Sequence, residues 1–143
     1  MHTQGLFHFD LKLENIMIDG PLELANMDAW VKIIDFGWVR SLLKQREGFE
    51  TYHQGTEEYN PPEIHNRVPF MGEPVDVFML GYVLFAMTLS AAPFEFADRK
   101  RCQFYNLLLQ GKYRDYWSCF KLASTLSEEL KDLLEWMFHH DPV

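Results

Sequence analysis

The sequence has little cysteine and no apolar segment long enough to cross a membrane. Its two cysteines, Cys102 and Cys119, provide neither a disulfide framework nor the ligand spacing of a zinc site. The longest apolar run, residues 77–89, falls short of the roughly 20 residues that a bilayer requires. The N-terminus lacks the basic and apolar regions of a signal peptide. We therefore expect an intracellular, cytoplasmic protein with reduced thiols and no membrane span.

Basic residues are also scarce. The chain has 13 lysines and arginines against 21 aspartates and glutamates, which gives a formal net charge of −8. This balance argues against nucleic acid or an anionic membrane as the main partner. Hydrophobic residues make up 48% and aromatic residues 15% of the 143 positions, enough for a packed core in one domain or in part of a larger one. The sequence does not indicate an oligomeric state.

Two short runs near the start of the chain have the composition of β-strands. Residues 16–18 and 30–34 are rich in β-branched and apolar side chains, and we expect them to pair antiparallel across an enlarged connection at 19–29. Residues 38–56 show no clear periodicity and carry several basic and hydroxyl side chains. We expect that segment to be a mobile loop.

Helical patterns dominate the rest of the chain. Residues 61–64 start a short helix, because proline suits a first helical turn, and a loop follows at 66–73. A helix at 74–89 is apolar on nearly every face, so other elements must surround it. Further helices are expected at 99–110 and 127–139. The last has an amphipathic stripe of Leu130, Leu133, Leu134, Met137 and Phe138. The expected fold class is mainly α with a short β-hairpin.

Residues 8–15 read His-Phe-Asp-Leu-Lys-Leu-Glu-Asn and contain the side chains with the clearest chemistry. Asp10 and Asn15 are separated by Lys12, and a second acid, Asp35, follows in an Ile-Ile-Asp-Phe-Gly run. An Asp that orients a hydroxyl, together with an Asn and an Asp that share metal ions, is suited to phosphoryl transfer.

Three ordered motifs resemble the eukaryotic protein kinase family of the serine/threonine type. They are the run 8–15, Asp-Phe-Gly at 35–37, and Gly-Thr-Glu-Glu-Tyr-Asn-Pro-Pro-Glu at 55–63. The resemblance implies a kinase-like C-terminal (large) lobe, with the N-terminal lobe absent. Residues 1–143 are then a partial kinase domain, made of a catalytic loop at 8–15, a metal-binding motif at 35–37, an activation segment at 35–63, a buried central helix at about 74–89 and a C-terminal helix at about 127–139.

The resemblance also implies a role for each matching polar residue. Asp10 accepts or orients the proton of the substrate hydroxyl, and Lys12 steadies the transferring phosphate. Asn15 and Asp35 hold the Mg²⁺ ions that bridge the phosphates of ATP, since hard oxygen ligands suit this metal. Thr56 belongs to the platform that seats the protein substrate and bonds near Asp10 and Lys12. The implied cofactors are ATP and Mg²⁺.

Five further residues are expected to be structural: His8, Phe36, Gly37, Glu63 and Asp76. The resemblance implies that Asp76 braces the backbone of the catalytic loop and that Glu63 pairs with an arginine beyond residue 143. We interpret His8 as a buried histidine that orients the backbone, not as a general base. The run His139-His140-Asp141 is interpreted as the fraying polar end of a helix and not as a metal site, because adjacent helical residues point in different directions.

The sequence departs from the family pattern at three points. Phe9 replaces the usual arginine that receives a phosphate from the activation loop, so we expect loop phosphorylation at Ser41 or Thr51 not to switch this protein by that route. The connection between Asn15 and Asp35 is longer than usual. No glycine-rich loop and no matching strand lysine occur, and we expect the isolated chain to be inactive.

Two other functions stay open at this point. A truncated or pseudokinase-like lobe would act as a binding or scaffold module without catalysis. A small-molecule phosphotransferase of the aminoglycoside- or choline-kinase type would use a similar His-x-Asp-x-x-x-x-Asn run. The motif at 55–63 favours the protein kinase over the second of these.

Overall fold

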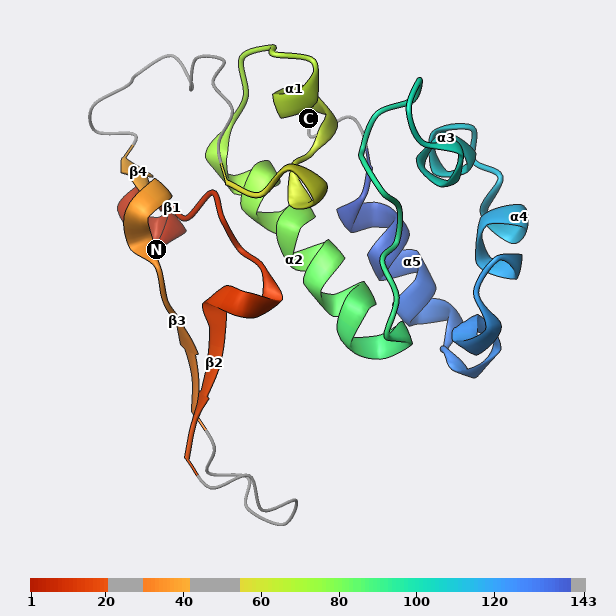
Figure 1. Ribbon diagram of the computed structural model, residues 1–143, viewed down its shortest axis with the longest axis horizontal. Helices are drawn as coiled ribbons and strands as arrows, with labels where there is room; N and C mark the ends of the chain where they lie inside the picture. Colours follow the sequence, from red (N-terminus) through yellow and green to blue (C-terminus); the bar gives the residue numbers. More distant parts are fainter. Residues whose placement is uncertain (21–29, 42–54, 140–143) are drawn as a thin grey trace.

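The structure is a computed structural model that describes residues 1–20, 30–41 and 55–139. The helices form one body, and a two-stranded ribbon projects from its side (Figure 1). In chain order, with η for 3₁₀ helices, the described elements are η1 (His2–Gln4), β1 (Leu6–Phe7), η2 (Leu13–Asn15), β2 (Ile16–Asp19), β3 (Trp30–Ile33), η3 (Phe36–Trp38), β4 (Arg40–Ser41), η5 (Glu57–Tyr59), α1 (Pro62–His65), α2 (Gly72–Leu89), α3 (Gln103–Leu109), α4 (Tyr113–Ser118), η6 (Lys121–Thr125) and α5 (Glu128–Met137).

The strands form two separate antiparallel pairs. Strand β2 pairs antiparallel with β3, as the sequence predicts, and the register places Ile16 opposite Ile33. Strand β1 pairs with β4, with Phe7 opposite Arg40. The second pair was not predicted, because two-residue strands leave no alternation in the sequence. The mainly α architecture with a β-hairpin is confirmed.

Helix α2 is the structural centre and contributes to two apolar clusters. Phe78, Tyr82 and Phe85 enter the larger cluster, which α3, α4 and α5 complete. Val75 and Met79 enter a smaller cluster beneath the catalytic loop. That cluster consists of Phe7, Phe9, Leu11, Ile64, Phe70, Val75 and Met79. One helix therefore supports both the helical body and the floor of the candidate site.

Not every face of α2 is covered by the described residues. Met87 is 67% exposed and Leu80 is 37% exposed, although the sequence predicts a helix surrounded on all sides. By length and composition alone, α2 could also cross a membrane, yet 56% of it is buried inside the protein. A helix that anchors two apolar clusters fits a core helix, as the sequence predicts.

The observed helix bounds correct two predictions. Helix α2 begins at Gly72 and not at Pro74. A Cβ at Gly72 would lie 2.2 Å from a carbon of the Phe7 ring, so only glycine allows the helix to start this close to β1. Helix α3 begins at Gln103 and not at Arg99. The side chain of Asp98 accepts from the Lys100 amide at 2.7 Å and forms a turn before the helix.

The C-terminal third contains one helix that was not predicted and one residue whose burial was predicted wrongly. Helix α4 was not predicted, because its six residues are too few to show a period. Helix α5 is capped at its start by Ser127, whose hydroxyl accepts from the Leu130 amide, and it ends at Met137 instead of His139. Leu133 was assigned to the buried stripe of this helix, but it is exposed, whereas Leu134 is fully buried.

The predicted loop at 38–56 is partly wrong. Its first residues form the end of η3 and the strand β4, where Arg40 and Ser41 pair with β1. Backbone pairing with β1 orders Arg40 and Ser41, and the side-chain pattern of the sequence does not indicate this pairing. Residues 42–54 lie outside the described residues, so the prediction is not tested for most of the segment.

Candidate active site

The catalytic loop is held from below by Asp76 of α2. One carboxylate oxygen accepts from the backbone amide of His8 and the other from that of Phe9, both at 2.9 Å. The ring nitrogen Nε2 of His2 lies 2.8 Å from the first of these oxygens. A single buried carboxylate thus fixes two successive amides of the loop. The sequence predicted this role for Asp76 but gave no sign that His2 takes part.

Phe9 adopts a backbone conformation that bulky residues rarely adopt. Its φ is +61°, in the left-handed region, and its side chain is completely buried. Such a conformation costs of order 1–3 kcal/mol and persists only where the surroundings enforce it. Here the bond to Asp76 and the packing of the ring between Phe7 and Phe70 enforce it.

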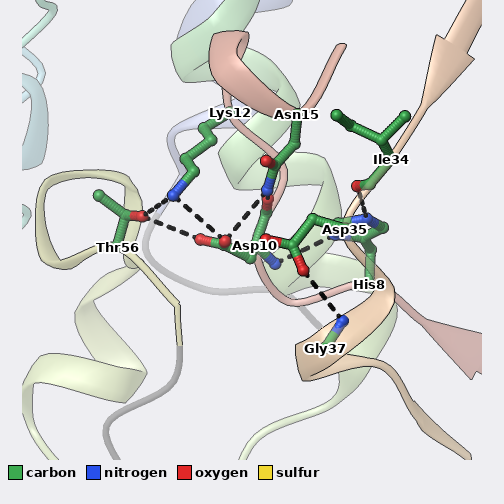
Figure 2. A network of polar contacts seen from close by, with 8 residues as sticks. All are labelled: His8, Asp10, Lys12, Asn15, Ile34, Asp35, Gly37 and Thr56. Carbon is green, nitrogen blue, oxygen red and sulfur yellow. Dashed lines mark hydrogen bonds and ion pairs between the residues drawn. The ribbon is translucent and has the colours of Figure 1, made fainter. Parts of the chain in front are cut away.

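Asp10 lies at the centre of a polar network (Figure 2). Its Oδ1 accepts from the Thr56 hydroxyl at 2.9 Å, and its Oδ2 accepts from Asn15 Nδ2 at 3.0 Å. The ammonium of Lys12 lies 3.3 Å from Oδ2 and donates to the Thr56 hydroxyl at 2.7 Å. Thr56 therefore joins the activation segment to Asp10 and Lys12, as the sequence predicts.

Gly55 makes this junction possible. Its φ is +65°, and a Cβ at this position would lie 2.4 Å from the backbone oxygen of Phe9. A side chain would therefore collide with the catalytic loop. Glycine lets the segment approach closely enough for Thr56 to reach Asp10.

Asn15 and Asp35 lie side by side at the end of the β2–β3 ribbon. The backbone oxygen of Asn15 accepts from the Ile34 amide at 2.9 Å, so strand pairing brings the two polar residues together. Asn15 is buried, and its Nδ2 also donates to the backbone oxygen of Asp10 at 2.7 Å. Its amide nitrogen is thereby occupied, so Oδ1 is the side-chain atom that could bind a cation. Asp35 is exposed, with φ +60°.

His8, Phe36 and Gly37, which were predicted to be structural, make contacts around Asp35. The Gly37 amide donates to Asp35 Oδ1 at 3.2 Å. His8 Nε2 lies 3.1 Å from the Ile34 carbonyl, while its Nδ1 lies 3.3 Å from the Asp10 amide. Both contacts are satisfied by the neutral tautomer with the proton on Nε2. The ring of Phe36 packs against that of His8, with centroids 5.4 Å apart. These contacts support an orienting role for His8.

The pairing predicted for Glu63 is not tested, because the expected arginine lies beyond residue 143. No lysine or arginine in the described ranges forms an ion pair with it. Burial raises the pKa of the Glu63 carboxyl above its ordinary value of 4.5, and a hydrogen bond from its own backbone lowers it in part. An ionised Glu63 is therefore disfavoured in this environment.

One cavity lies away from the polar network around Asp10. It has a volume of about 520 Å³ and is lined by residues of η5, α2, the loop between α2 and α3, and α3, including Glu58, Tyr82 and Phe104. None of the residues around Asp10 lines it.

No cluster of three or more potential metal ligands of the His, Cys, Asp or Glu type occurs among the described residues. Asn15 and Asp35 are instead a pair of oxygen-bearing side chains whose backbones are joined through the Asn15–Ile34 hydrogen bond. Mg²⁺ commonly uses one or two protein ligands of this kind and completes its shell with water and phosphate oxygens. His139 is exposed, and the two residues after it lie outside the described part of the chain, so the metal question at that end is untested.

A family model described as "Protein kinase domain" matches residues 1–143. The chain is 34% identical over 141 residues to sperm motility kinase 3A of Mus musculus. It is 33% identical over 144 residues to NUAK family SNF1-like kinase 1 of Homo sapiens. It is 30% identical over 142 residues to the probable serine/threonine-protein kinase MARK-B of Dictyostelium discoideum.

These alignments cover nearly all of this chain but a small part of each relative. Each includes 99% of the chain. The chain spans 24% of the length of the sperm motility kinase and 18% of each of the other two proteins.

Proposed function

The chain belongs to the protein kinase family, and from this premise we propose that it forms the substrate-facing half of a site that transfers the γ-phosphate of ATP to serine or threonine hydroxyls of proteins. The observation that carries the proposal is the network in which Asp10, Lys12, Asn15 and Thr56 converge. ATP and the peptide hydroxyl would meet above this network. We place the reaction inside the cell, where ATP is available.

Asp10 is proposed to orient the acceptor hydroxyl and to take its proton. A carboxylate offers about four acceptor positions. Three of these are engaged by Thr56, Asn15 and Lys12. One position therefore stays available for an incoming hydroxyl, and the three contacts hold the carboxylate so that this position has a fixed direction. A prepositioned general base of this kind contributes typically 10²–10⁴-fold to a rate.

Lys12 and Thr56 are proposed to hold the phosphate and the peptide. The Lys12 ammonium is part of the same triangle as Asp10 and Thr56, and its side chain is 22% exposed, so it can reach an incoming phosphoryl oxygen. Thr56 both accepts from Lys12 and donates to Asp10. It thereby keeps the cation and the base at a set separation while the substrate backbone passes over the activation segment.

Asn15 and Asp35 fit a role as ligands of the Mg²⁺ ions that accompany ATP. They present oxygen atoms, the ligand type that this metal prefers. The nitrogen of the Asn15 amide is directed at Asp10, so its oxygen is the atom left for a cation. Bound Mg²⁺ would neutralise charge on the transferring phosphate. The chain's own contribution is to fix the two ligands beside each other through the Asn15–Ile34 backbone bond.

The sequence contains no glycine-rich phosphate loop of the kind that covers ATP in this family. We therefore propose that the chain works together with a separate nucleotide-covering segment. By this proposal the 143 residues supply the base, the lysine and the metal ligands, and the separate segment covers the nucleotide.

A binding or scaffold role without catalysis is the second candidate. The exposed apolar side chains on the β2–β3 ribbon, including Trp30 at 73% exposure and Val31 at 67%, favour contact with another polypeptide. The intact Asp10, Lys12 and Asp35 favour catalysis. The family match favours a protein kinase over a small-molecule phosphotransferase.

The test is phosphate transfer from Mg·ATP to a mixed-sequence peptide library with a fixed serine or threonine. The chain is assayed alone and as part of any longer product that carries a glycine-rich loop. Activity is expected only with the nucleotide-covering segment, and Asp10→Asn should lower it by about 10²–10⁴-fold. Activity that survives Asp10→Asn contradicts the catalytic proposal. A rate from the 143-residue chain alone, lost in Asp35→Ala, contradicts the need for a second segment.

A further inference from the structure

A stack of four side chains joins the end of the activation segment to the loop between α2 and α3 and takes no part in the network around Asp10. The guanidinium of Arg101 lies 4.1 Å from the centroid of the Phe96 ring, over its face, and one of its nitrogens lies 3.0 Å from a carboxylate oxygen of Glu57. The imidazole of His65 packs edge-on against Phe96, with centroids 6.3 Å apart and planes at 85°. The order of the stack is Glu57, Arg101, Phe96, His65.

Arg101 projects from a turn that is itself fixed. Its backbone amide and that of Cys102 both donate to the carbonyl of Asp98, at 3.2 and 2.9 Å. The Asp98 side chain accepts from the Lys100 amide at 2.7 Å. The guanidinium is therefore presented from an ordered support and not from the end of a free loop.

The two outer members of the stack are the two ends of one short segment. Glu57 begins η5, and His65 ends α1. Between them, the ring of Tyr59 packs on Tyr82 of α2, with centroids 4.2 Å apart. Arg101 and Phe96 thus hold residues 57–65 at both ends, while α2 holds the middle.

Thr56 is the residue immediately before this segment, and its carbonyl accepts from the Tyr59 amide at 3.1 Å. Any shift of Glu57 is therefore passed to Thr56 through one peptide bond and one hydrogen bond. Thr56 in turn contacts Asp10 and Lys12.

From this geometry we propose that Arg101 is a positioning residue, which clamps the 57–65 segment and so sets where Thr56 meets Asp10 and Lys12. The proposal rests on the proposed function for its catalytic consequence, but not for the clamp itself. The side chains of Arg101 and Glu57 are about half exposed, at 49% and 47%. An exposed ion pair is weak, and the aromatic face adds a further modest contribution. The expected effect of losing the clamp is therefore several-fold and not complete.

The clamp is tested first without any assay of activity, by amide hydrogen exchange of the chain. Arg101→Gln is expected to accelerate exchange at the Tyr59 and Asn60 amides by roughly three- to tenfold, because it removes both the exposed ion pair and the cation–π interaction, and each of these is weak. Lys100→Gln is the matched control, since it removes a neighbouring exposed charge and should leave these amides unchanged. Equal exchange in Arg101→Gln and wild type overturns the clamp.

Swapping the charges of residues 57 and 101 distinguishes a direct contact between them from a general loosening of the fold. Glu57→Arg and Arg101→Glu should each accelerate exchange, whereas the double variant should return toward wild-type rates, because the pair is rebuilt with its charges reversed. A double variant that exchanges as fast as the two single effects combined overturns the proposed contact.

The consequence for chemistry is tested in whichever form of the protein is active. Arg101→Gln is expected to lower kcat by roughly three- to tenfold and to leave the KM for ATP unchanged, because the clamp acts on Thr56 and not on the metal ligands. Unchanged kcat beside accelerated exchange overturns the positioning role. Asp10→Asn distinguishes the two proposals: if it leaves the rate unchanged, the proposed function fails, while hydrogen exchange still decides the clamp.

Discussion

The rings of Phe9 and Phe70 meet edge to face beneath the catalytic loop, with centroids 5.7 Å apart and planes at 85°. Phe9 directly precedes Asp10, and Phe70 lies in the loop before α2. The position where the family pattern has an arginine is therefore occupied here by an apolar contact in a closed cluster. A side chain held in this way cannot receive a phosphate group.

Phe9→Arg is expected to destabilise the protein by at least about 3 kcal/mol. Phe9 is completely buried, and its side chain packs in a cluster of apolar residues, so a guanidinium there would lose its water. The measurement is the free energy of unfolding in urea. Phe9→Leu is the control, and it should cost only about 1–2 kcal/mol, because it keeps the site apolar and changes only its volume. Similar stabilities for the two variants would show that the pocket accepts charge.

Thr56→Val should lower kcat/KM of an active form about 10- to 100-fold. Valine keeps the shape of threonine but removes the hydroxyl that joins Lys12 to Asp10, so the base and the cation lose their common contact. Thr56→Ser retains that hydroxyl and should stay within a few-fold of wild type. Steady-state peptide phosphorylation measures both variants. A Thr56→Val variant that stays within a few-fold of wild type would contradict the role assigned to the hydroxyl.

Glu63→Gln should stabilise the chain at pH 7. Burial raises the pKa of Glu63 above 4.5, so the folded state binds the proton more tightly than the unfolded state does. A raised pKa means that stability falls as pH rises from about 4.5 through the folded-state value, where the buried carboxylate ionises. Glutamine has no charge to desolvate. The advantage of the variant should therefore disappear when unfolding is measured below pH 4.5.

Glu95→Gln is the matched control for that experiment, because Glu95 is exposed. It should change stability by less than about 0.5 kcal/mol at either pH. A loss of stability in Glu63→Gln at pH 7 would mean that a cation pairs with this carboxylate, contrary to the contacts of the described residues.

Much of the fold follows from patterns that local physics determines. The β2–β3 pair, α1, α2 and α5 appear where periodicity and proline indicate them. The β1–β4 pair and α4 could not be predicted, because they are too short to carry a period and form only through tertiary contacts. The exposure of Leu133 could not be predicted for a similar reason. The amphipathic pattern of a helix does not show which residues at the edge of its apolar face are covered by neighbouring elements.

The candidate site was more accessible to prediction than the fold around it. The side chains of Asp10, Lys12 and Thr56 meet as their motifs predict, and Asp76 binds the loop amides. Their catalytic roles stay predictions. The contact of His2 with Asp76 and the stack at Arg101 could not be foreseen, because both join segments far apart in sequence and neither forms a motif.

Helix α2 places Val75 and Met79 under the catalytic loop and Phe78 and Tyr82 in the helical body, on successive turns of one element. Unfolding of α2 would therefore open both apolar clusters together, and the loop would lose its support when the helical body opens. The loop at 8–15 therefore loses its conformational entropy when this chain folds. Any polypeptide that docks on this loop would then meet a surface already ordered by the folding of this chain, which lowers the conformational entropy lost on association.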